Sequence, residues 1–257
     1  MLVYFGAVDL FMPASEFSLQ DLTSKWFGTL KPARMEVVPI LFDGPMTSIS
    51  SDSAKNGESQ VLNNKVSGHK NSFVGLFVGR FVPNKGVELL IDVIQKWHTK
   101  KSQETEKKII LIVAGKVTPG FEFYFEELQA KIKFLGLNDC IHFTIDPSQD
   151  VLKRHFAEAD FFICASRHEG FCMPIIEAQM AGLPVIALNS TAVPETMGLG
   201  GLVVEQGKDQ IEDFCARIEE VLTNPELRLK LVQSGKENLA RFDSSKVGAK
   251  FLGLLNV

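Results

Sequence analysis

From residue 72 onward, short apolar runs alternate with amphipathic segments, and this alternation strongly limits the possible folds. Runs such as 72–79 and 107–115 are apolar at nearly every position, which predicts strands buried on both faces. Between them, 85–98 repeats apolar residues at helical spacing. Strands and helices in this order form a parallel sheet, covered by helices on both faces and joined by right-handed crossovers. We therefore expect an α/β fold with a doubly wound, Rossmann-like parallel sheet.

The same patterns place the individual elements. Expected strands cover 72–79, 107–115, 140–144, 160–166, 184–188 and 200–205, and expected helices cover 85–98, 121–136, 148–159, 174–182, 209–223 and 225–241. Asn224 before Pro225 is a typical helix start, with an N-cap residue followed by proline. In such sheets ligands bind beyond the carboxyl ends of the strands, so the strand-to-helix turns are the places to search for a site.

The first 71 residues follow a different pattern. Segments 8–15 and 35–40 are expected strands on either side of a helix at 16–27, and the polar tract 44–71 is expected to be a linker or mobile loop. Two strands and one helix are too few for a hydrophobic core of their own. We therefore divide the chain into 1–43, 44–71 and a main domain at 72–257, and expect 1–43 to be loosely held or to pair with another chain.

Composition excludes several classes of protein. The 257 residues are 45% hydrophobic and 23% charged, as in ordinary globular proteins, and the net charge is −4 without a block of like charges. This charge gives no reason to expect a nucleic-acid partner. No apolar stretch is long enough for a membrane span, and the N-terminus is a poor signal peptide. The four cysteines and five histidines lack metal-ligand spacing, so we expect no metal and a reducing cytoplasm.

The first motif is GRFVPNKG, residues 79–86, in the turn between the first strand and helix of the main domain. Gly79 ends the strand, Arg80 follows it, and Lys85 precedes the helix. A guanidinium can bind phosphate through two hydrogen bonds, and the start of a helix adds positive potential. The motif is therefore a candidate diphosphate site. The alternative is an ordinary pair of solvated cations in a loop.

The second motif is RHEGFCMPIIEA, residues 167–178. Pro174 suits the first turn of a helix, where backbone N–H groups have no partner within the helix. Glu177 lies about one turn further on, and helical side chains lean back toward the helix start. Its carboxylate, and that of Glu169 in the preceding loop, are suited to accept hydrogen bonds from sugar hydroxyls. The alternative is an acidic first turn that only complements the helix dipole.

Cys172 lies at the start of the same helix. A helix start can lower the pKa of a thiol, so a nucleophilic cysteine is an alternative chemistry here. His168 is close in sequence, but no pattern marks it as the partner of a catalytic cysteine.

Together these segments resemble the donor site of retaining glycosyltransferases of family 4, which share the GT-B fold of two Rossmann-like domains. The resemblance rests on E-G-F-x-x-P-x-x-E at 169–177 followed by A-x-x-x-G-x-P-V-I at 178–186. GRFVPNKG, FFICASRHEGF and VPETMGLGGLVVE resemble neighbouring family segments, and ASEFSLQDL and MEVVPILFD resemble the end of the first domain and the crossing between domains. The match covers most of residues 9–240.

The resemblance implies roles for individual residues. Arg80 and Lys85, next to Gly79, would hold the diphosphate of a nucleoside diphosphate sugar and stabilise it as it departs. Glu177 would bind the ribose, and Glu169 the transferred sugar. Donor contacts from backbone N–H groups are implied for three consecutive residues, Phe171, Cys172 and Met173, and a position near the base for Thr144. Transfer would proceed with retention and without a metal.

Two departures from the family bear on function. Cys172 and Met173 stand where the family usually has glycine and leucine. The chain also contains only the last part of a first domain, so we expect the donor-binding half of an enzyme acting on a glycan or lipid-linked acceptor. The alternatives are a truncated module that binds sugar nucleotides without catalysis and one half of a two-chain enzyme, with a separate acceptor-domain chain as partner. A cytoplasmic location is expected, with peripheral membrane association left open.

An epimerase-like Rossmann protein is a further alternative. It would need a glycine-rich dinucleotide turn after the first strand, and GRFVPNKG does not provide one.

Overall fold

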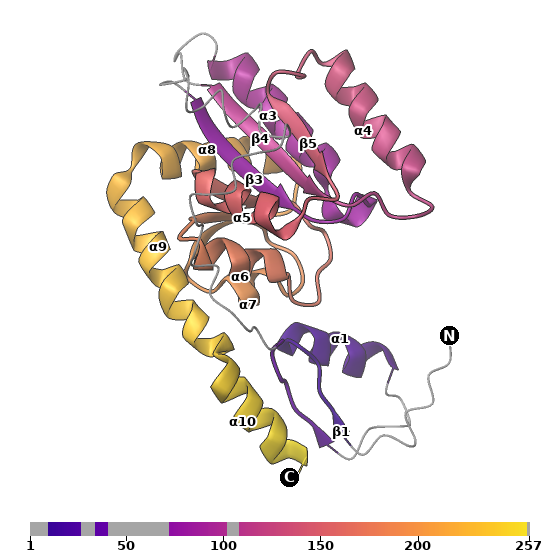
Figure 1. Cartoon of the computed structure of the whole chain (residues 1–257), viewed down its shortest axis with the longest axis vertical. Coiled ribbons are helices and arrows are strands. Elements are labelled where there is room, and N and C mark those ends of the chain that lie inside the picture. Colours follow the sequence, from indigo (N-terminus) through magenta and orange to yellow (C-terminus); the bar gives the residue numbers. More distant parts are fainter. Residues whose placement is uncertain (1–9, 27–33, 41–71, 102–107, 256–257) are drawn as a thin grey trace.

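The computed structural model describes residues 10–26, 34–40, 72–101 and 108–255 (Figure 1). The segment expected to be a linker or mobile loop, 44–71, lies outside the described residues.

A six-stranded, entirely parallel sheet forms the centre of the main domain (Figure 1). Its strand order is β5-β4-β3-β6-β7-β8, so the chain builds outward from β3 in one direction and then from β6 in the other. The strands are β3 (Ser72–Val78), β4 (Lys108–Gly115), β5 (Ile141–Ile145), β6 (Phe161–Cys164), β7 (Val185–Leu188) and β8 (Gly201–Val204). The expected doubly wound α/β fold is confirmed.

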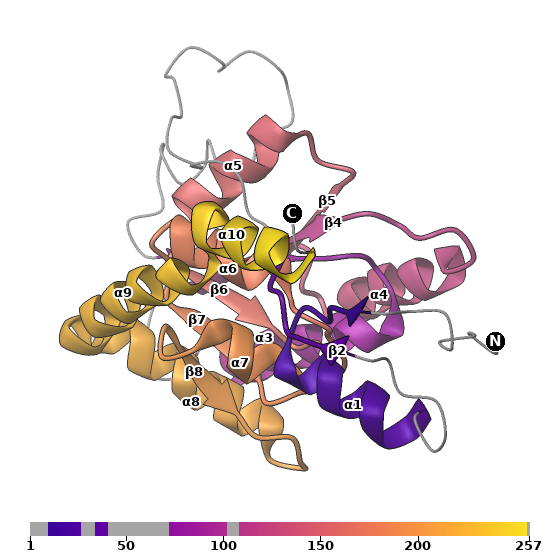
Figure 2. The same ribbon diagram turned by 90° about the horizontal axis from the view of Figure 1, so that it is seen from below.

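Helices cover both faces of this sheet, with α3 and α8 on one side and α5 and α6 on the other (Figure 2). The helices are α3 (Val87–Lys101), α4 (Glu122–Phe134), α5 (Gln149–Glu158), α6 (Met173–Met180), α7 (Val193–Met197), α8 (Gln210–Thr223), α9 (Pro225–Leu239) and α10 (Ser244–Leu255), with short 3₁₀ turns at η2 (Pro83–Lys85) and η3 (Ala240–Phe242). Within the described part of the chain, no helix combines the length and apolarity needed to cross a membrane.

Alternate residues of each strand enter different halves of the core. In β6, Phe161 and Ile163 pack on the side of α3 and α8, whereas Phe162 and Cys164 pack on the side of α5 and α6. All four are at most 2% exposed. Burial on both faces explains why these strands are continuous apolar runs rather than alternating ones.

Several elements differ from the expectation. Helix α6 begins at Met173, one residue before Pro174, and the chain has two helices, α7 and α10, that periodicity did not predict. Helix α7 is only 5 residues long, too short for a periodic pattern, and α10 contains Gly248 and Gly253, which lower helix propensity. The spacing of apolar residues did not predict α7 and α10, because both helices are stabilised by tertiary contacts.

The described part of the N-terminal segment docks on the main domain beside α10 (Figures 1 and 2). It contains helix α1 (Glu16–Trp26) and two short parallel strands, β1 (Leu10–Phe11) and β2 (Arg34–Met35). The expected strands at 8–15 and 35–40 are thus much shorter within the described residues. Backbone hydrogen bonds continue a little beyond the strands, from the Glu36 N–H to the Phe11 carbonyl at 3.1 Å and from the Val38 N–H to the Pro13 carbonyl at 3.0 Å.

The N-terminal segment is attached through both of its described pieces. The Glu195 carboxylate of α7 accepts hydrogen bonds from the backbone N–H groups of Glu16 (2.9 Å) and Phe17 (3.1 Å) at the start of α1. On the other side, the Lys250 ammonium of α10 donates to the Val37 carbonyl at 2.8 Å. The partner of this segment is therefore the same chain, at least for residues 10–26 and 34–40.

We predict that Gly86→Ala destabilises the protein much more than Gly136→Ala. Both glycines have φ of 67°, but a Cβ at Gly86 would lie 2.2 Å from the Ala165 carbonyl oxygen, whereas Gly136 has open space. The shared left-handed conformation costs about 1–2 kcal/mol for alanine, and the clash should add about 2 kcal/mol at Gly86. Urea unfolding of both variants measures the difference. Equal losses would show that the approach of the loop to β6 is not tight.

We also predict that Glu195→Ala loosens α1. Loss of a carboxylate that caps two N–H groups should cost about 1 kcal/mol and speed amide exchange at the start of α1 by roughly fivefold. Hydrogen exchange followed by mass spectrometry measures this. Glu226→Ala, at an exposed position in the first turn of α9, serves as the control and should leave α1 unchanged. Unaltered exchange in Glu195→Ala would contradict the proposed attachment.

Candidate functional site

The candidate site lies where the sheet changes direction. Strands β3 and β6 are neighbours, yet the chain continues from β3 to β4 on one side and from β6 to β7 on the other. The loops that leave β3 and β6 therefore start at a topological switch point at the carboxyl edge, where doubly wound sheets usually bind ligands in the crevice between such loops. GRFVPNKG follows β3, and RHEGFCMPIIEA follows β6. The topology thus brings the two sequence motifs together.

A glycine allows the two loops to approach closely. Gly86 has a left-handed conformation, and a side chain at this position would collide with the backbone of Ala165, the residue after β6. The close approach places Lys85, immediately before it, against the loop that follows β6. This explains the last glycine of GRFVPNKG on steric grounds.

Hydrogen bonds join the two loops along their length. The Arg167 amide donates to the Asn84 carbonyl at 2.8 Å, and the Arg167 guanidinium donates to the Pro83 carbonyl at 3.3 Å. Arg167 also forms an ion pair with Glu88 in the first turn of α3. Sequence reasoning missed these residues because each one acts through a contact some 80 positions away. They hold the crevice in shape.

The central contact of the site is an ion pair between two predicted residues. Lys85 Nζ lies 2.5 Å from Glu169 Oε1, and the two side chains are 15% and 11% exposed. A pair this sheltered from solvent is stronger than a surface pair, because water screens it less. Arg80, in contrast, is exposed, and its guanidinium has no ion-pair partner among the described residues. Within the described part of the chain, the Arg80 guanidinium is therefore available to bind an anionic ligand.

The start of α6 supplies hydrogen-bond donors to the same crevice. Cys172, its N-cap residue, has φ 72° and ψ 66°, a left-handed conformation that is rare outside glycine. Within the described residues, the backbone N–H groups of Phe171, Cys172 and Met173 donate to no acceptor. Phe171 itself packs edge-on against Phe242 at 5.3 Å, so its side chain belongs to the core. At Phe171 only the backbone is therefore available to a ligand.

Glu177 is the second carboxylate of the motif and lies within α6. Burial raises the pKa of its carboxyl above the usual range. No hydrogen-bond donor from the described residues reaches this carboxylate. A half-buried acceptor without a partner costs folding free energy, which is typical of a group kept for a ligand.

The alternative of a nucleophilic cysteine is wrong. Cys172 is only 6% exposed, and its sulfur lies 3.9 Å from the sulfur of Cys164. A hydrogen bond to Cys164, together with burial, raises the pKa of the Cys172 thiol well above its ordinary value. A buried, protonated thiol is a poor nucleophile, because the thiolate is the reactive form. The low pKa expected for an isolated helix-start cysteine is absent because Cys172 is hydrogen-bonded to a second thiol and buried.

Thr144 forms no hydrogen bond with the other predicted site residues within the described part of the chain. It lies in β5, the edge strand two positions from β3, and its hydroxyl lies 3.0 Å from His155 Nε2. Burial, and then the nearby positive charge of Arg154, lower the pKa of His155 to about 4, so this imidazole is neutral. Gly79 directly follows β3, and its amide donates to the Ala114 carbonyl of β4 at 3.0 Å.

The N-terminal segment also touches the site, which the sequence did not indicate. The hydroxyls of Ser15 and Ser18 donate to the Gly170 carbonyl at 2.7 and 3.1 Å. They fix the peptide between Gly170 and Phe171 and thereby orient the free Phe171 N–H. ASEFSLQDL therefore supports the loop that carries Glu169.

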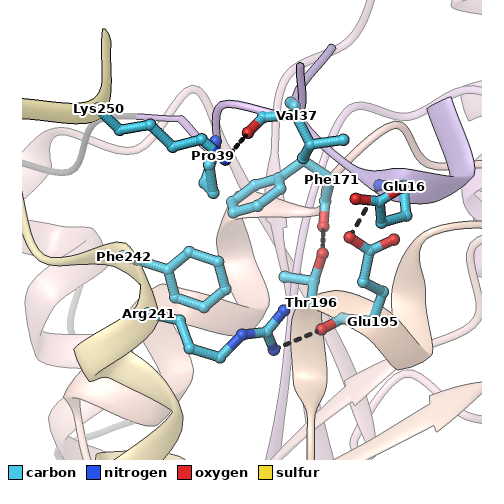
Figure 3. A pocket seen from close by; sticks show the side chains of 10 residues that line it. Glu16, Val37, Pro39, Phe171, Glu195, Thr196, Arg241, Phe242 and Lys250 are labelled. Carbon is cyan, nitrogen blue, oxygen red and sulfur yellow. Dashed lines mark hydrogen bonds between the residues drawn. The ribbon is translucent and has the colours of Figure 1, made fainter. Parts of the chain in front are cut away.

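A small cavity of about 180 Å³ separates the N-terminal segment from α7, η3 and α10 (Figure 3). It is lined by Glu16, Val37, Phe171, Glu195, Arg241, Phe242 and Lys250, among others. Figure 3 shows that the charged groups are already engaged: Arg241 donates to the Glu195 carbonyl at 2.9 Å, and Lys250 donates to Val37. Arg241 and Lys250 therefore already have protein partners in this cavity, whereas the two sequence motifs meet at the β3–β6 switch point.

Comparison with known proteins agrees with this geometry. The family model of the group 1 glycosyl transferases matches residues 60–238. An uncharacterized glycosyltransferase of Methanocaldococcus jannaschii is 33% identical over 175 residues, which cover 67% of this chain and 44% of that protein. A GDP-mannose:cellobiosyl-diphosphopolyprenol alpha-mannosyltransferase of Xanthomonas oryzae is 31% identical over 144 residues, 56% of this chain and 36% of that protein. The chain spans less than half the length of these relatives.

Solved structures share the fold. The Anabaena HepE structure in complex with UDP and glucose matches with a TM-score of 0.76 at 21% identity, over 96% of this chain and 63% of that one. A glycosyltransferase from Rickettsia africae matches with a TM-score of 0.77 at 18% identity, over 98% and 65%. These matches confirm the α/β fold expected for the C-terminal half of a GT-B glycosyltransferase. On the family match over most of its length, the chain belongs to the group 1 glycosyl transferases.

Proposed function

We propose that the crevice binds a nucleoside diphosphate sugar and that the chain is the donor-binding half of a glycosyltransferase that transfers the sugar with retention to a glycan or lipid-linked acceptor. The observation that carries the proposal is the convergence of Lys85, Glu169 and the unpaired N–H groups of the α6 start at the β3–β6 switch point. Family membership supports the same reaction class.

Each residue has a defined part in this proposal. Arg80 and Lys85 bind the diphosphate, and the N–H groups of Phe171, Cys172 and Met173 add donors at a helix start, where negative charge is favoured. These groups act where charge grows as the diphosphate departs, so no metal ion is needed for transfer. Retention belongs to the proposal and is tested by comparing the anomeric configuration of donor and product by NMR.

The carboxylates bind the two sugars of the donor. Glu177 accepts hydrogen bonds from the ribose hydroxyls, and Glu169 accepts them from the transferred sugar. Glu169 forms an ion pair with Lys85 in the structure. The two side chains are therefore already ordered before the donor binds. Such preorganisation reduces the free energy spent on ordering the site when the ligand binds.

We also propose a cellular location and partners for the chain. All four cysteines are free thiols, consistent with the reducing cytoplasm that the sequence predicts. Because the chain spans less than half the length of its relatives, we propose that acceptor contacts come from a part outside these residues or from a separate acceptor-domain chain. Peripheral association with a membrane remains open in this proposal.

We predict saturable binding of one nucleotide class when the full chain is titrated by calorimetry with UDP-glucose and with GDP-mannose in the presence of a chelator. Lys85→Met and Arg80→Met should each weaken binding by about tenfold, since a hydrogen bond to a charged group contributes about 1.5–3 kcal/mol. Lys230→Met, on α9 away from the crevice, is the matched control. Absence of binding to either donor by the folded chain would overturn the proposal for this chain alone.

We predict opposite effects of Glu177→Gln on stability and on binding. Because burial raises the pKa of Glu177, its contribution to the free energy of unfolding is present at low pH and is lost as pH rises through the raised pKa. The variant should therefore be at least as stable as the parent at neutral pH, yet bind donor more weakly. Affinity of the parent should fall as pH drops through the same pKa, because only the carboxylate accepts two hydroxyl protons.

The variant removes this titration. Urea unfolding and calorimetry across pH on the parent and on Glu177→Gln measure both effects. A variant that is clearly less stable, or that keeps full donor affinity, would show that Glu177 has a structural role instead.

A further inference from the structure

Two thiols and a carboxylate meet beneath the donor loop. Cys164 is the last residue of β6, Cys172 is the N-cap of α6, and Glu169 lies in the loop between them. The two sulfurs are 3.9 Å apart, and one ligand atom from each of the three residues lies within 4.8 Å of the others. The cysteines are 2% and 6% exposed, so the cluster is sheltered from solvent on the side of the core.

The backbone conformation of Cys172 is unfavourable for a residue with a side chain. With φ of 72°, this position favours glycine, and an L residue pays about 1–2 kcal/mol to adopt it. A cysteine side chain is nevertheless present, and its sulfur lies 3.9 Å from that of Cys164. Glycine at this position would avoid the conformational cost.

The donor set and its spacing suit a particular kind of ion. Thiolates select thiophilic metals, and two sulfurs with one carboxylate form a ligand set that suits Zn²⁺. Zn–S bonds of about 2.3 Å in a tetrahedral site place two sulfurs about 3.8 Å apart, close to the 3.9 Å in the structure. Three protein ligands leave a fourth position for water. The sequence spacing 164, 169 and 172 matches no standard metal motif, which is why pattern reading missed it.

We propose that Cys164, Cys172 and Glu169 form a binding site for a thiophilic divalent cation of the Zn²⁺ type. Each thiol that coordinates the ion gives its proton to the buffer, and Glu169 exchanges its ion pair with Lys85 for the metal. Because the proposed function assigns the same carboxylate to the transferred sugar, metal and donor compete for Glu169. This last consequence rests on the proposed function; the metal site does not.

The site is tested with Cd²⁺ as a spectroscopic probe and Zn²⁺ as its competitor, on the full chain kept reduced with a phosphine. We expect a thiolate-to-metal charge-transfer band that saturates at one equivalent of Cd²⁺ and is displaced by Zn²⁺. Cys172→Gly is the decisive variant, because glycine fits the left-handed backbone and the protein should fold at least as well. It should lose the band and weaken metal binding by about 100-fold, comparable to the loss of a metal-site group.

The other two cysteines are natural controls. Cys140→Ser and Cys215→Ser alter thiols that lie outside the cluster and should leave the band unchanged. Glu169→Gln should weaken binding without removing the two-sulfur band. A band that persists in Cys172→Gly, or that disappears in Cys140→Ser, would overturn the site.

Competition with the donor is measured separately by titrating Cd²⁺ into the chain with and without UDP-glucose or GDP-mannose. A lower Cd²⁺ affinity in the presence of donor, with the two-sulfur band retained as in Glu169→Gln, supports both the site and the role of Glu169. An unchanged Cd²⁺ affinity, with donor binding detected by calorimetry, keeps the metal site and overturns the assignment of Glu169 to the sugar. No donor binding at all counts against the proposed function only.

Discussion

The ion pair between Lys85 and Glu169 depends on the reversal of strand order between β3 and β6. The two residues are 84 positions apart and meet because their strands are neighbours whose chains leave in opposite directions. The left-handed Gly86 then allows the first loop to pass against Ala165, and the Arg167–Asn84 hydrogen bond fixes the second loop to it. Without this close approach, the cations after β3 and the carboxylate after β6 would line separate surfaces and could not act on one ligand.

A second layer of contacts controls the backbone of the donor loop. Ser15 and Ser18 hold the Gly170 carbonyl, and the Thr196 hydroxyl holds the Phe171 carbonyl from α7. Both carbonyls are occupied by these bonds, and the N–H groups of Phe171 and Cys172 donate to no acceptor among the described residues. The N-terminal segment is thus a support for the site, and α7 connects the two through Glu195.

The site carries unfavourable local features that a purely structural loop would avoid. Glu177 is half-buried without a hydrogen-bond donor, Cys172 is strained, and the α6 amides lack acceptors within the described chain. Each feature costs free energy in the unliganded protein, and each becomes favourable when a ligand or ion supplies the missing partner. Their occurrence within one short segment is the physical argument that binding, rather than stability, shaped it.

The amino-acid sequence by itself determined the α/β class, most strands and helices of the main domain, and the two motifs, because continuous apolar runs, helical spacing, glycines and prolines act locally. It did not determine which groups pair. The Lys85–Glu169 ion pair, the Cys164–Cys172 contact that removes nucleophilic character, and the serines under Gly170 arise from residues distant in sequence that the sheet order brings together. Helices α7 and α10 were missed for the same reason. Only tertiary structure decides such contacts, because they depend on which strand ends lie side by side.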